Sequence, residues 1–324
     1  MSKKKKLRLV CLLGVTILGI SGCAKREEDV KTNIKETDQV TIEEAAKDDG
    51  THINRKLGES GNELIIDADI IVPRNVKEGK VKVGFPDVSI IEKNLCQGKQ
   101  MEQIKKNEWA IKPKEKKSYL YEKYYGYDEQ FASFYDALLM EQTRKESPNK
   151  QNEEEVITSL KEKGKTLLEQ CGYTTAVYNE LREEGNGTSV ELEYVSMLDG
   201  VWVAENRIGF LTNDMTISEQ GVKELRFGKQ YTIVNQEDTT VLPISKIIDI
   251  LQQSMNHNQF MPLDETITRI RLGYYVDEQQ NLIPVWCFSF KFDKDECLAY
   301  CVNAKTGKMM FDYQSYSTPG EAED

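Results

Sequence analysis

The chain has 324 residues, of which 54 are acidic and 43 are lysine or arginine, so its formal charge is −11 at neutral pH. Proteins that bind nucleic acids need clustered cations, and this balance excludes a nucleic-acid partner. The length exceeds what a single hydrophobic core usually serves, so we expect at least two domains.

The first 22 residues predict a lipoprotein signal peptide of the bacterial type. A lysine run at 3–6 precedes an apolar segment at 9–20, and small residues come directly before Cys23. The apolar segment is too short to span a bilayer, which needs about 20 apolar residues, and its order is typical of a processed export signal. We therefore expect cleavage before Cys23 and a lipid, diacylglycerol with palmitate, on the thiol of this residue.

This motif predicts a location at the outer face of the cytoplasmic membrane, with the lipid on Cys23 as the membrane contact. Removal of the signal also removes five basic residues, which takes the formal charge from −11 to −16. Residues 23–62 are polar and charge-mixed, with few large apolar side chains. Such a segment buries too little surface to fold, so we predict a flexible tether.

An N-terminal α+β region is expected over residues 63–149. Alternating apolar residues predict a strand at 64–72, and a second run at 80–85 is interpreted as its neighbour. Asp87 is placed to cap a short helix. Aromatic residues at helical spacing then predict a helix over 128–144.

The next unit is expected over residues 150–238, as one helix followed by an antiparallel sheet. Apolar residues recur along one stripe of a helix over 153–171, and Gly164 lies on the same stripe, where it lowers the helix propensity. Short alternating runs separated by turn residues then predict strands. They lie at 175–181, 189–197, 201–210 and 222–227.

The same arrangement returns in a C-terminal unit over 239–316, before a tail at 317–324. An amphipathic helix begins behind Pro243, and four alternating runs follow it. These predicted strands lie at 268–276, 282–292, 296–303 and 308–313. Residues 198–203 also match 281–286 weakly. The predicted fold class is therefore α+β, with tandem units that each pack a helix on an antiparallel β-sheet.

Five cysteines follow Cys23, and none is spaced from another as a C-x-x-C pair. They are Cys96, Cys171, Cys287, Cys297 and Cys301. We therefore expect no metal site and no cofactor.

A hairpin turn at 293–295 would set apolar residues of its two strands opposite one another, which supports this register. The predicted pairs are Trp286 with Val302, Phe288 with Tyr300, and Phe290 with Leu298. The same register places Cys287 opposite Cys301 on the other face, where a disulfide and a pair of buried thiols are both compatible. Cys297 is expected on that face too, opposite Lys291.

Five tyrosines crowd into nine positions, at Tyr119, Tyr121, Tyr124, Tyr125 and Tyr127. Their rings are candidates for stacking on sugar faces or for anchoring a protein interface. The alternative is an aromatic layer that packs beneath the following helix.

Two carboxylates, Asp67 and Asp69, share one side of the first predicted strand. Paired carboxylates can bind a metal ion or share a proton, but the solvated face of an edge strand is the favoured interpretation. The only histidines, His52 and His257, are expected at solvated surface positions.

Residues 300–310, Tyr-Cys-Val-Asn-Ala-Lys-Thr-Gly-Lys-Met-Met, resemble the last two strands of PepSY-like domains, which end in strand, Asn or Asp, Ala, any residue, Thr, Gly, strand. With Leu272-Gly273-Tyr274 and Ile283-Pro284-Val285-Trp286 ahead of it, the stretch 240–314 also resembles the C-terminal domain of the secreted YycH and YycI regulators. The whole chain resembles uncharacterised lipoprotein families of Gram-positive bacteria. The resemblance implies a non-enzymatic module that restrains a sensor kinase through its ectodomain or inhibits a secreted protease, and it transfers no catalytic residue.

The sequence contains no Gly-rich phosphate loop, no H-E-x-x-H and no G-x-S-x-G motif. We therefore predict a membrane-anchored extracytoplasmic lipoprotein that is not an enzyme and acts as a protein-binding or regulatory module. The alternative is binding of a cell-envelope glycan or small ligand through the tyrosine cluster. A carboxylate-dependent hydrolase is a further alternative, because such enzymes leave faint motifs.

Overall fold

The computed structural model describes eleven stretches of the chain. They are residues 34–59, 62–114, 117, 119–128, 131–143, 153–173, 177–185, 189–204, 212–256, 264–292 and 295–312. The predicted signal peptide, Cys23, His257 and the predicted tail at 317–324 lie outside these stretches.

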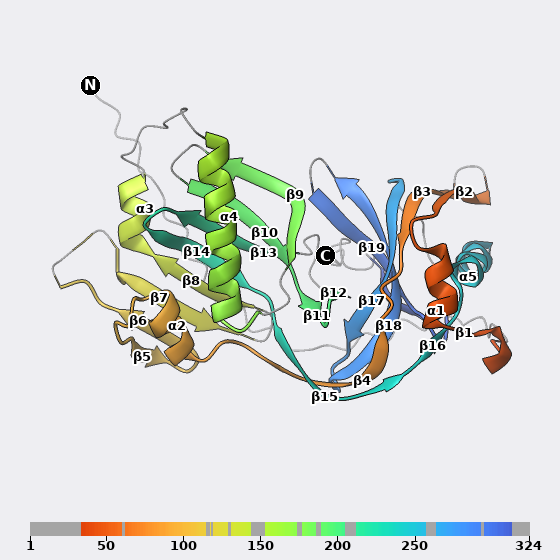
Figure 1. The fold of residues 1–324 in the computed structure, drawn as a ribbon, viewed down its shortest axis with the longest axis horizontal. Coiled ribbons are helices and arrows are strands. Elements are labelled where there is room, and N and C mark those ends of the chain that lie inside the picture. The colour runs from red at the N-terminus through yellow and green to blue at the C-terminus, as the bar shows by residue number, and fades with distance from the viewer. Residues whose placement is uncertain are drawn as a thin grey trace, which may run out of the picture. The chain divides into compact units, whose positions relative to one another are not determined.

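The fold is α+β, as the sequence predicts: two large, mostly antiparallel sheets carry a small number of helices (Figure 1). The helices are α1 (Ile42–Ala45), α2 (Val88–Asn94), α3 (Ala137–Thr143), α4 (Glu153–Gln170) and α5 (Ile244–Asn256), with 3-10 turns η1 (Glu36–Asp38) and η2 (Ala46–Asp48). None of these helices combines the length and the apolar character needed to cross a bilayer.

The first large sheet has eight strands in the order β5-β6-β7-β8-β14-β13-β10-β9. Their bounds are β5 (Glu102–Lys105), β6 (Glu108–Ile111), β7 (Lys123–Tyr127), β8 (Ala132–Asp136), β9 (Val177–Gly185), β10 (Ser189–Val195), β13 (Thr212–Ser218) and β14 (Gly221–Phe227). All neighbours in this sheet are antiparallel.

Helices α2 and α4 belong to one face of the eight-stranded sheet, where they enclose a core that we call the α4 core. Asp87 caps α2, because its carboxylate accepts a hydrogen bond from the Ser89 backbone N–H at 2.9 Å. Leu160 and Leu168 of α4 are buried against strand residues such as Phe134 and Phe227. Side chains on these strands alternate between this core and the opposite face of the sheet.

The second large sheet has ten strands, and β17 (Ile267–Val276) and β18 (Asn281–Phe292) form its centre. The other strands are β2 (His52–Glu59), β3 (Asn62–Ile71), β4 (Lys77–Gly84), β11 (Met197–Leu198), β12 (Val201–Ala204), β15 (Gln230–Asp238), β19 (Asp295–Asn303) and β20 (Met309–Asp312). Besides pairing with each other, each central strand pairs with two further strands. Strand β17 pairs in parallel with β3 and β12, and β18 pairs antiparallel with β19 and β4.

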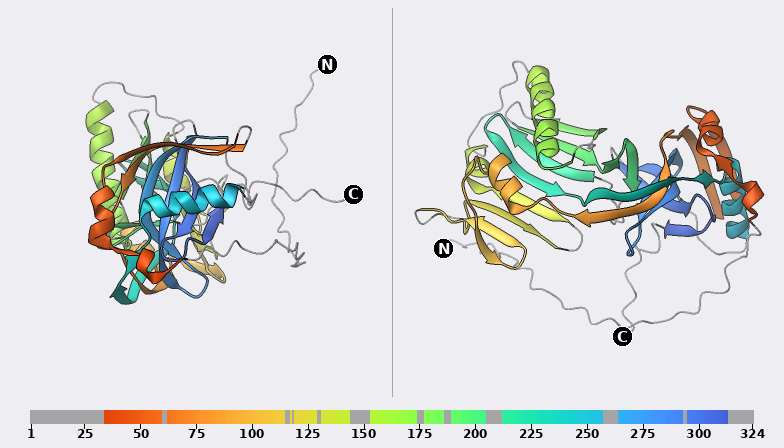
Figure 2. Two further views of the ribbon diagram at one scale, coloured as in Figure 1. Left: turned by 90° about the vertical axis from the view of Figure 1, so that its right-hand side faces the viewer. Right: turned by 60° about the horizontal axis from the view of Figure 1, so that its bottom comes forward.

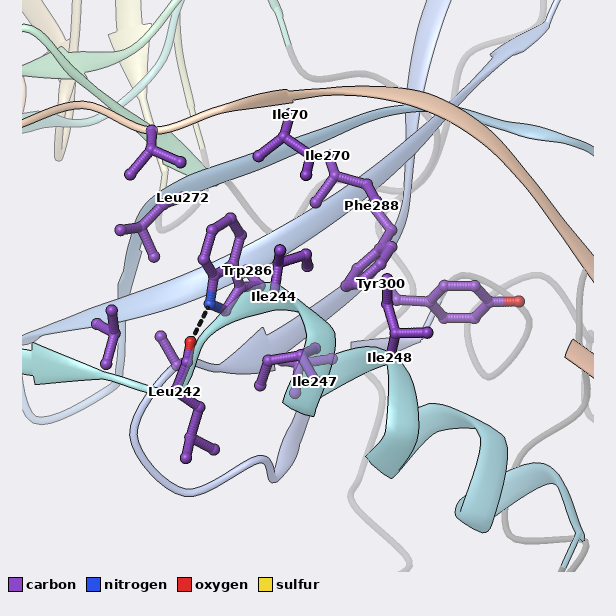
Figure 3. Packing of buried hydrophobic residues seen from close by; sticks show 14 of the residues in the cluster. Ile70, Leu242, Ile244, Ile247, Ile248, Ile270, Leu272, Trp286, Phe288 and Tyr300 are labelled. Atoms are coloured by element: carbon purple, nitrogen blue, oxygen red, sulfur yellow. Dashed lines mark hydrogen bonds between the residues drawn. The ribbon is translucent and has the colours of Figure 1, made fainter. Parts of the chain in front are cut away.

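Helix α5 packs its apolar stripe on one face of the ten-stranded sheet, in a cluster that we call the α5 core. Ile244, Ile247 and Ile248 of the helix meet Trp286 and Phe288 of β18 there (Figure 3). The Trp286 ring is fully buried and donates a hydrogen bond from Nε1 to the Leu242 carbonyl oxygen at 2.9 Å. The buried indole therefore keeps its one polar atom satisfied.

A third cluster, which we call the outer-face cluster, covers the opposite face of the same sheet at its centre. It contains Val195, Trp202, Ala204, Val285, Cys287, Leu298, Cys301 and Phe311. Residues 284–290 of β18 are consequently all buried, on both faces of the strand.

The prediction of a flexible tether as far as residue 62 is wrong for residues 34–59. Strand β2 pairs with β3 over its whole length, and a short strand β1 (Val40–Thr41) pairs with β16 (Thr240–Val241). Apolar residues are sparse here, but Ile42, Ala45 and Leu57 all reach the α5 core. The composition did not reveal this ordered segment, because three well-placed apolar side chains and a ladder of backbone hydrogen bonds are enough to hold it in place.

The predicted units are also not consecutive in the sequence. Strands β2, β3 and β4 belong to the ten-stranded sheet, and β11 and β12 join it from the middle of the chain. Residues 198–203 and 281–286 therefore lie in one sheet rather than in two copies of a unit. Strand β4 pairs with β15 and β18, not with β3 as predicted.

The helix predicted over 128–144 is a strand followed by a short helix, β8 and then α3. Phe134 faces the α4 core, while Ser133 and Tyr135 do not, which is a period of two rather than 3.6. The other predicted helices are confirmed as α2, α4 and α5. Strands β2, β5, β6, β7, β13 and β15 were not predicted.

Strands β4 and β15 form a two-stranded ribbon that continues from one large sheet to the other (Figures 1 and 2). Strand β4 leads into α2, and β15 follows directly after β14 of the eight-stranded sheet. A bulge at Val234 interrupts the ladder, and this side chain is 66% exposed. Such a bulge makes a free strand edge a poor template for pairing.

Candidate functional site

The five predicted tyrosines divide between the two faces of the eight-stranded sheet. Tyr125 is fully buried in the α4 core and donates a hydrogen bond to the Pro86 carbonyl oxygen at 2.6 Å. Tyr127 packs against the same core, with its ring 5.3 Å from that of Phe85. These two residues therefore pack in a core, although with α2 and α4 and not beneath the helix that was predicted to follow them.

Tyr121 and Tyr124 lie on the opposite face and form a stack with Tyr135. The Tyr124 and Tyr135 rings are 5.2 Å apart at 16°, and the Tyr121 and Tyr124 rings are 6.1 Å apart at 23°. Tyr124 and Tyr135 are cross-strand neighbours in the β7–β8 ladder, which sets them side by side. Tyr119 makes no ring contact within the described part of the chain, so it does not join the stack.

Gly126 makes room for this stack. A Cβ atom at this position would overlap the Tyr124 hydroxyl group, so the tyrosine ring lies over the glycine. A strand glycine often marks close approach by another group, and here the group is the ring two residues earlier.

Carboxylates surround the stack. Glu108 and Asp128 both raise the pKa of Tyr124, which burial raises first, and the phenol reaches about 12. Glu224 of β14 is exposed and lies in register with Tyr135. The Tyr135 pKa is likewise raised, first by burial. The phenols therefore remain protonated at neutral pH and present hydroxyl groups among negative charges. We call Tyr121, Tyr124, Tyr135, Glu108, Asp128 and Glu224 together the tyrosine face.

The sequence interpretation missed Tyr135 because it placed this residue on a helix. The alternation of buried and half-buried residues from Ala132 to Asp136 is the signal that identifies it. Arg226 also lies beside the stack, where its guanidinium is 5.5 Å from the Phe131 ring centre and Nη1 is 3.5 Å from an Asp214 carboxylate oxygen.

This ring geometry is unsuited to a sugar-binding platform. A sugar stacks on an open aromatic face, but the Tyr124 ring is stacked against two neighbouring rings. This part of the sheet therefore carries packed tyrosine rings and their hydroxyl groups. Those are groups that tyrosine contributes to protein interfaces.

Asp67 and Asp69 of β3 flank the imidazole of His52 on β2. His52 Nδ1 is 2.8 Å from Asp69 Oδ1, and Nε2 is 2.8 Å from Asp67 Oδ1. These hydrogen bonds raise the His52 pKa above its usual value of 6.5. Among the described residues no group of three or more His, Cys, Asp or Glu side chains is arranged to hold a metal ion.

Cys287 and Cys301 lie opposite each other, as predicted, with their Sγ atoms 3.2 Å apart as free thiols. The prediction that Cys297 shares their face is wrong. Ala299 of β19 is an extra residue that bulges between the Phe288–Tyr300 and Ser289–Leu298 pairs, so Cys297 pairs with Phe290 and packs in the α5 core. The predicted pair of Phe290 with Leu298 is therefore wrong, whereas Trp286 and Phe288 keep their predicted partners.

A charged triad beside these thiols, with a buried carboxylate at its centre and Arg269 at its exposed side, was not predicted. The Glu296 carboxylate accepts hydrogen bonds from Arg269 Nη1 and Arg271 Nη2, both at 2.5 Å. The Arg271 guanidinium lies 4.8 Å from the centre of the Trp202 ring. Burial lowers the pKa of Arg271, while Glu296 acts in the opposite direction. The triad spans β17 and β19 and belongs to the covered centre of the sheet.

Comparisons with known proteins show limited similarity. No family model matches the chain, and no curated protein sequence is similar to it. A crystal structure of an uncharacterized protein from Eubacterium rectale is similar at 14% identity with a TM-score of 0.47, over 83% of this chain and 98% of that one. The Bacillus megaterium YpeB C-terminal domain is similar at 11% identity with a TM-score of 0.32, over 70% of this chain and 96% of that domain. At this overlap, neither protein indicates what this chain binds or does.

Proposed function

We propose that this protein is a lipid-anchored, extracytoplasmic, non-catalytic module that binds another protein through the tyrosine face. The observation that carries the proposal is the stack of Tyr121, Tyr124 and Tyr135 near carboxylates, on a part of the sheet face where these rings are half-buried and Glu224 is exposed. The sequence motif at Cys23 supports the anchoring, and the PepSY-like residues at 300–310 support a regulatory role. A sensor-kinase ectodomain or a secreted protease is the proposed partner.

The chemistry of the face defines the segment it binds. Asp128 and Glu224 attract cations, Glu108 already pairs with Lys105 Nζ at 3.5 Å, and the mature chain is expected to carry a formal charge of −16. A guanidinium group pairs with carboxylates and also packs on aromatic rings. The occupant is therefore an arginine-bearing segment of a protein at the membrane.

Site-specific photo-crosslinking in the native membrane tests this proposal. A photoreactive residue replaces Tyr121 in the full chain, and a matched control places it at Lys165, which is exposed on α4. We expect one protein to be captured at position 121 and not at position 165. Capture of the same protein at both positions would contradict the tyrosine face as its docking site.

Two substitutions, Gly126→Ala and Glu224→Arg, test whether binding depends on the tyrosine face. Gly126→Ala displaces the Tyr124 ring without changing charge, and Gly84→Ala is the control because no atom lies within 4 Å of its added Cβ. Glu224→Arg reverses a charge at the rim of the stack. We expect Gly126→Ala and Glu224→Arg each to weaken binding about tenfold or more, with Gly84→Ala unchanged.

Two other results would overturn the proposal. Purified protein that binds envelope glycans in a Tyr121-dependent way, with no protein captured, would favour the ligand-binding alternative. Turnover of a wall-derived substrate would show an enzyme. Mass spectrometry of the peptide that contains Cys23 tests the anchor separately, because the lipid adds to the mass of that peptide.

A further inference from the structure

Strands β18 and β19 bring two thiols together inside the outer-face cluster. Cys287 and Cys301 are directly opposed in the ladder, both are fully buried, and their Sγ atoms are 3.2 Å apart. A disulfide needs about 2.05 Å between the sulfur atoms. The pair of free thiols and the disulfide therefore differ by small side-chain rotations.

The fold excludes the other described cysteines from this pair. Cys297 faces the α5 core, on the opposite side of the same sheet, because the bulge at Ala299 turns it away. Cys96 and Cys171 lie in the α4 core, where burial raises the pKa of each thiol to about 12. Cys287 and Cys301 are therefore the two thiols that share the outer-face cluster and lie in direct contact.

Access determines when this bond could form. Burial raises the pKa of Cys301 well above its usual value, so its thiol stays protonated in the folded protein and reacts slowly. Cys287 is covered by the same cluster. Oxidation is therefore expected while the hairpin is still open, as the chain folds after export, rather than in the finished structure.

We propose that Cys287 and Cys301 form a cross-strand disulfide during folding outside the cytoplasm, a location that rests on the function proposed above. The two thiols lose two protons and two electrons as the Sγ–Sγ bond forms. A disulfide-bearing oxidant, either a thiol oxidoreductase or oxidised glutathione, accepts them, and its own disulfide becomes two thiols. Disulfides between directly opposed strand residues are strained and more easily reduced.

Peptide mapping tests the pairing. Trypsin cuts after Arg271, Lys291, Lys294 and Lys305, so Cys287 falls in the peptide 272–291 and Cys301 shares the peptide 295–305 with Cys297. The unreduced full chain, alkylated in denaturant, should give these two peptides linked. The linked species should persist in Cys297→Ser and disappear in Cys301→Ser. Persistence in Cys301→Ser would assign the bond to Cys297 and overturn the proposal.

Two preparations separate this inference from the proposed location. One is the full chain extracted from its own envelope, and the other is the full chain refolded with reduced and oxidised glutathione. A bond in the refolded chain supports the pairing, and its absence from the envelope sample would then contradict the extracytoplasmic location alone. Free Cys287 and Cys301 in the refolded chain would overturn the pairing, whatever the location.

Thermal unfolding tests the disulfide without peptide mapping. Reductant should lower the Tm of the oxidised chain by on the order of 5–10 °C, because the bond restrains the unfolded state. Cys297→Ser should show the same shift, and Cys301→Ser should show none. An equal response of Cys301→Ser to reductant would contradict the proposal.

Discussion

The two sheets differ in how their faces are covered, and this difference separates structure from function. The eight-stranded sheet buries one face in the α4 core and leaves the region of the other face around Tyr124, Tyr135 and Glu224 half-buried or exposed. The ten-stranded sheet is covered on both faces at its centre, by the α5 core and by the outer-face cluster. Polar groups at a covered centre must find partners within the protein, whereas those on an open face remain available to another molecule.

The charged groups follow this rule. Glu296 at the covered centre holds two arginines and is 3% exposed, while Glu224 on the open face is exposed. The covered carboxylate is therefore a structural group, and the open one belongs to the proposed binding surface. Substitutions can test this assignment, because replacing Glu296 should lower the stability of the fold and replacing Glu224 should weaken binding.

Of the substitutions considered, Glu296→Ala is expected to lower the free energy of unfolding the most. The substitution leaves Arg269 and Arg271 without their shared carboxylate, and Arg271 is largely buried. Breaking a buried ion pair by removing one partner costs about 3–5 kcal/mol in the free energy of unfolding. Urea unfolding measures this, with Glu224→Ala as the control that should change stability by less than about 0.5 kcal/mol. Equal effects of the two variants would contradict the difference between covered and open faces.

The next effect concerns the ion pair between Lys123 and Asp136 in the eight-stranded sheet. Lys123→Met removes the cation, but Asp136 still accepts hydrogen bonds from the backbone N–H groups of Leu138 and Leu139, at 3.1 and 3.2 Å. We therefore expect a smaller loss than for Glu296→Ala, about 2–3 kcal/mol by urea unfolding.

An exposed pair provides the control for this variant. Lys112 Nζ and Glu102 Oε2 are 3.3 Å apart, with side chains 63% and 74% exposed, and Lys112→Met should cost less than about 1 kcal/mol. A loss for Lys123→Met as small as that for Lys112→Met would show that the buried pair adds nothing beyond a surface one.

Much of this organisation could be predicted from the sequence, and the misses have physical causes. Capping and amphipathic stripes identify α2, α4 and α5, and apolar pairing identifies the centre of the C-terminal hairpin. The bulge at Ala299 has no local sequence signal, so the position of Cys297 could not be predicted. The membership of β2, β3 and β4 in the C-terminal sheet depends on long-range pairing, which periodicity does not report.

The candidate site was predictable only in part. The crowding of tyrosines indicates an aromatic surface, but which rings face outward depends on strand phase, and a one-residue change in phase exchanges the faces. The phase of β7 separates Tyr124 from Tyr125. Tyr135 was missed because short runs with mixed aromatic and polar residues fit helix and strand periods almost equally.

A smaller effect compares the two faces of β7 directly. Tyr125→Phe removes the hydroxyl that donates to the buried Pro86 carbonyl, and we expect a loss of about 1–2 kcal/mol. Tyr124→Phe removes a hydroxyl from the half-buried stack and should leave stability within about 0.5 kcal/mol. Differential scanning calorimetry or urea unfolding measures both. A larger loss for Tyr124→Phe would place the structural face on the wrong side of the strand.

The smallest expected effect on stability concerns His52, on the paired strands β2 and β3 at the uncovered margin of the ten-stranded sheet. His52 is hydrogen-bonded to Asp69 and Asp67, which raises its pKa above the usual value of 6.5. A raised folded-state pKa means that the stabilisation is fully present below about pH 6.5 and is lost as the pH rises through the folded-state value. The side chain is 53% exposed, so solvent and salt screen the interaction and the change in stability is small.

NMR titration of the imidazole measures this pKa directly, because the chain has only two histidines and His257→Gln identifies the other. We expect a midpoint above 6.5 that falls toward the usual value in Asp69→Asn and Asp67→Asn. The Tm difference between the wild type and His52→Gln should be larger near about pH 5.5 than near about pH 8.5. A difference that grows with pH would have the opposite sign and would mean that these carboxylates do not stabilise the charged imidazole. The margin of the sheet would then be governed by desolvation, as its covered centre is, and the distinction between open and covered faces would fail at this position.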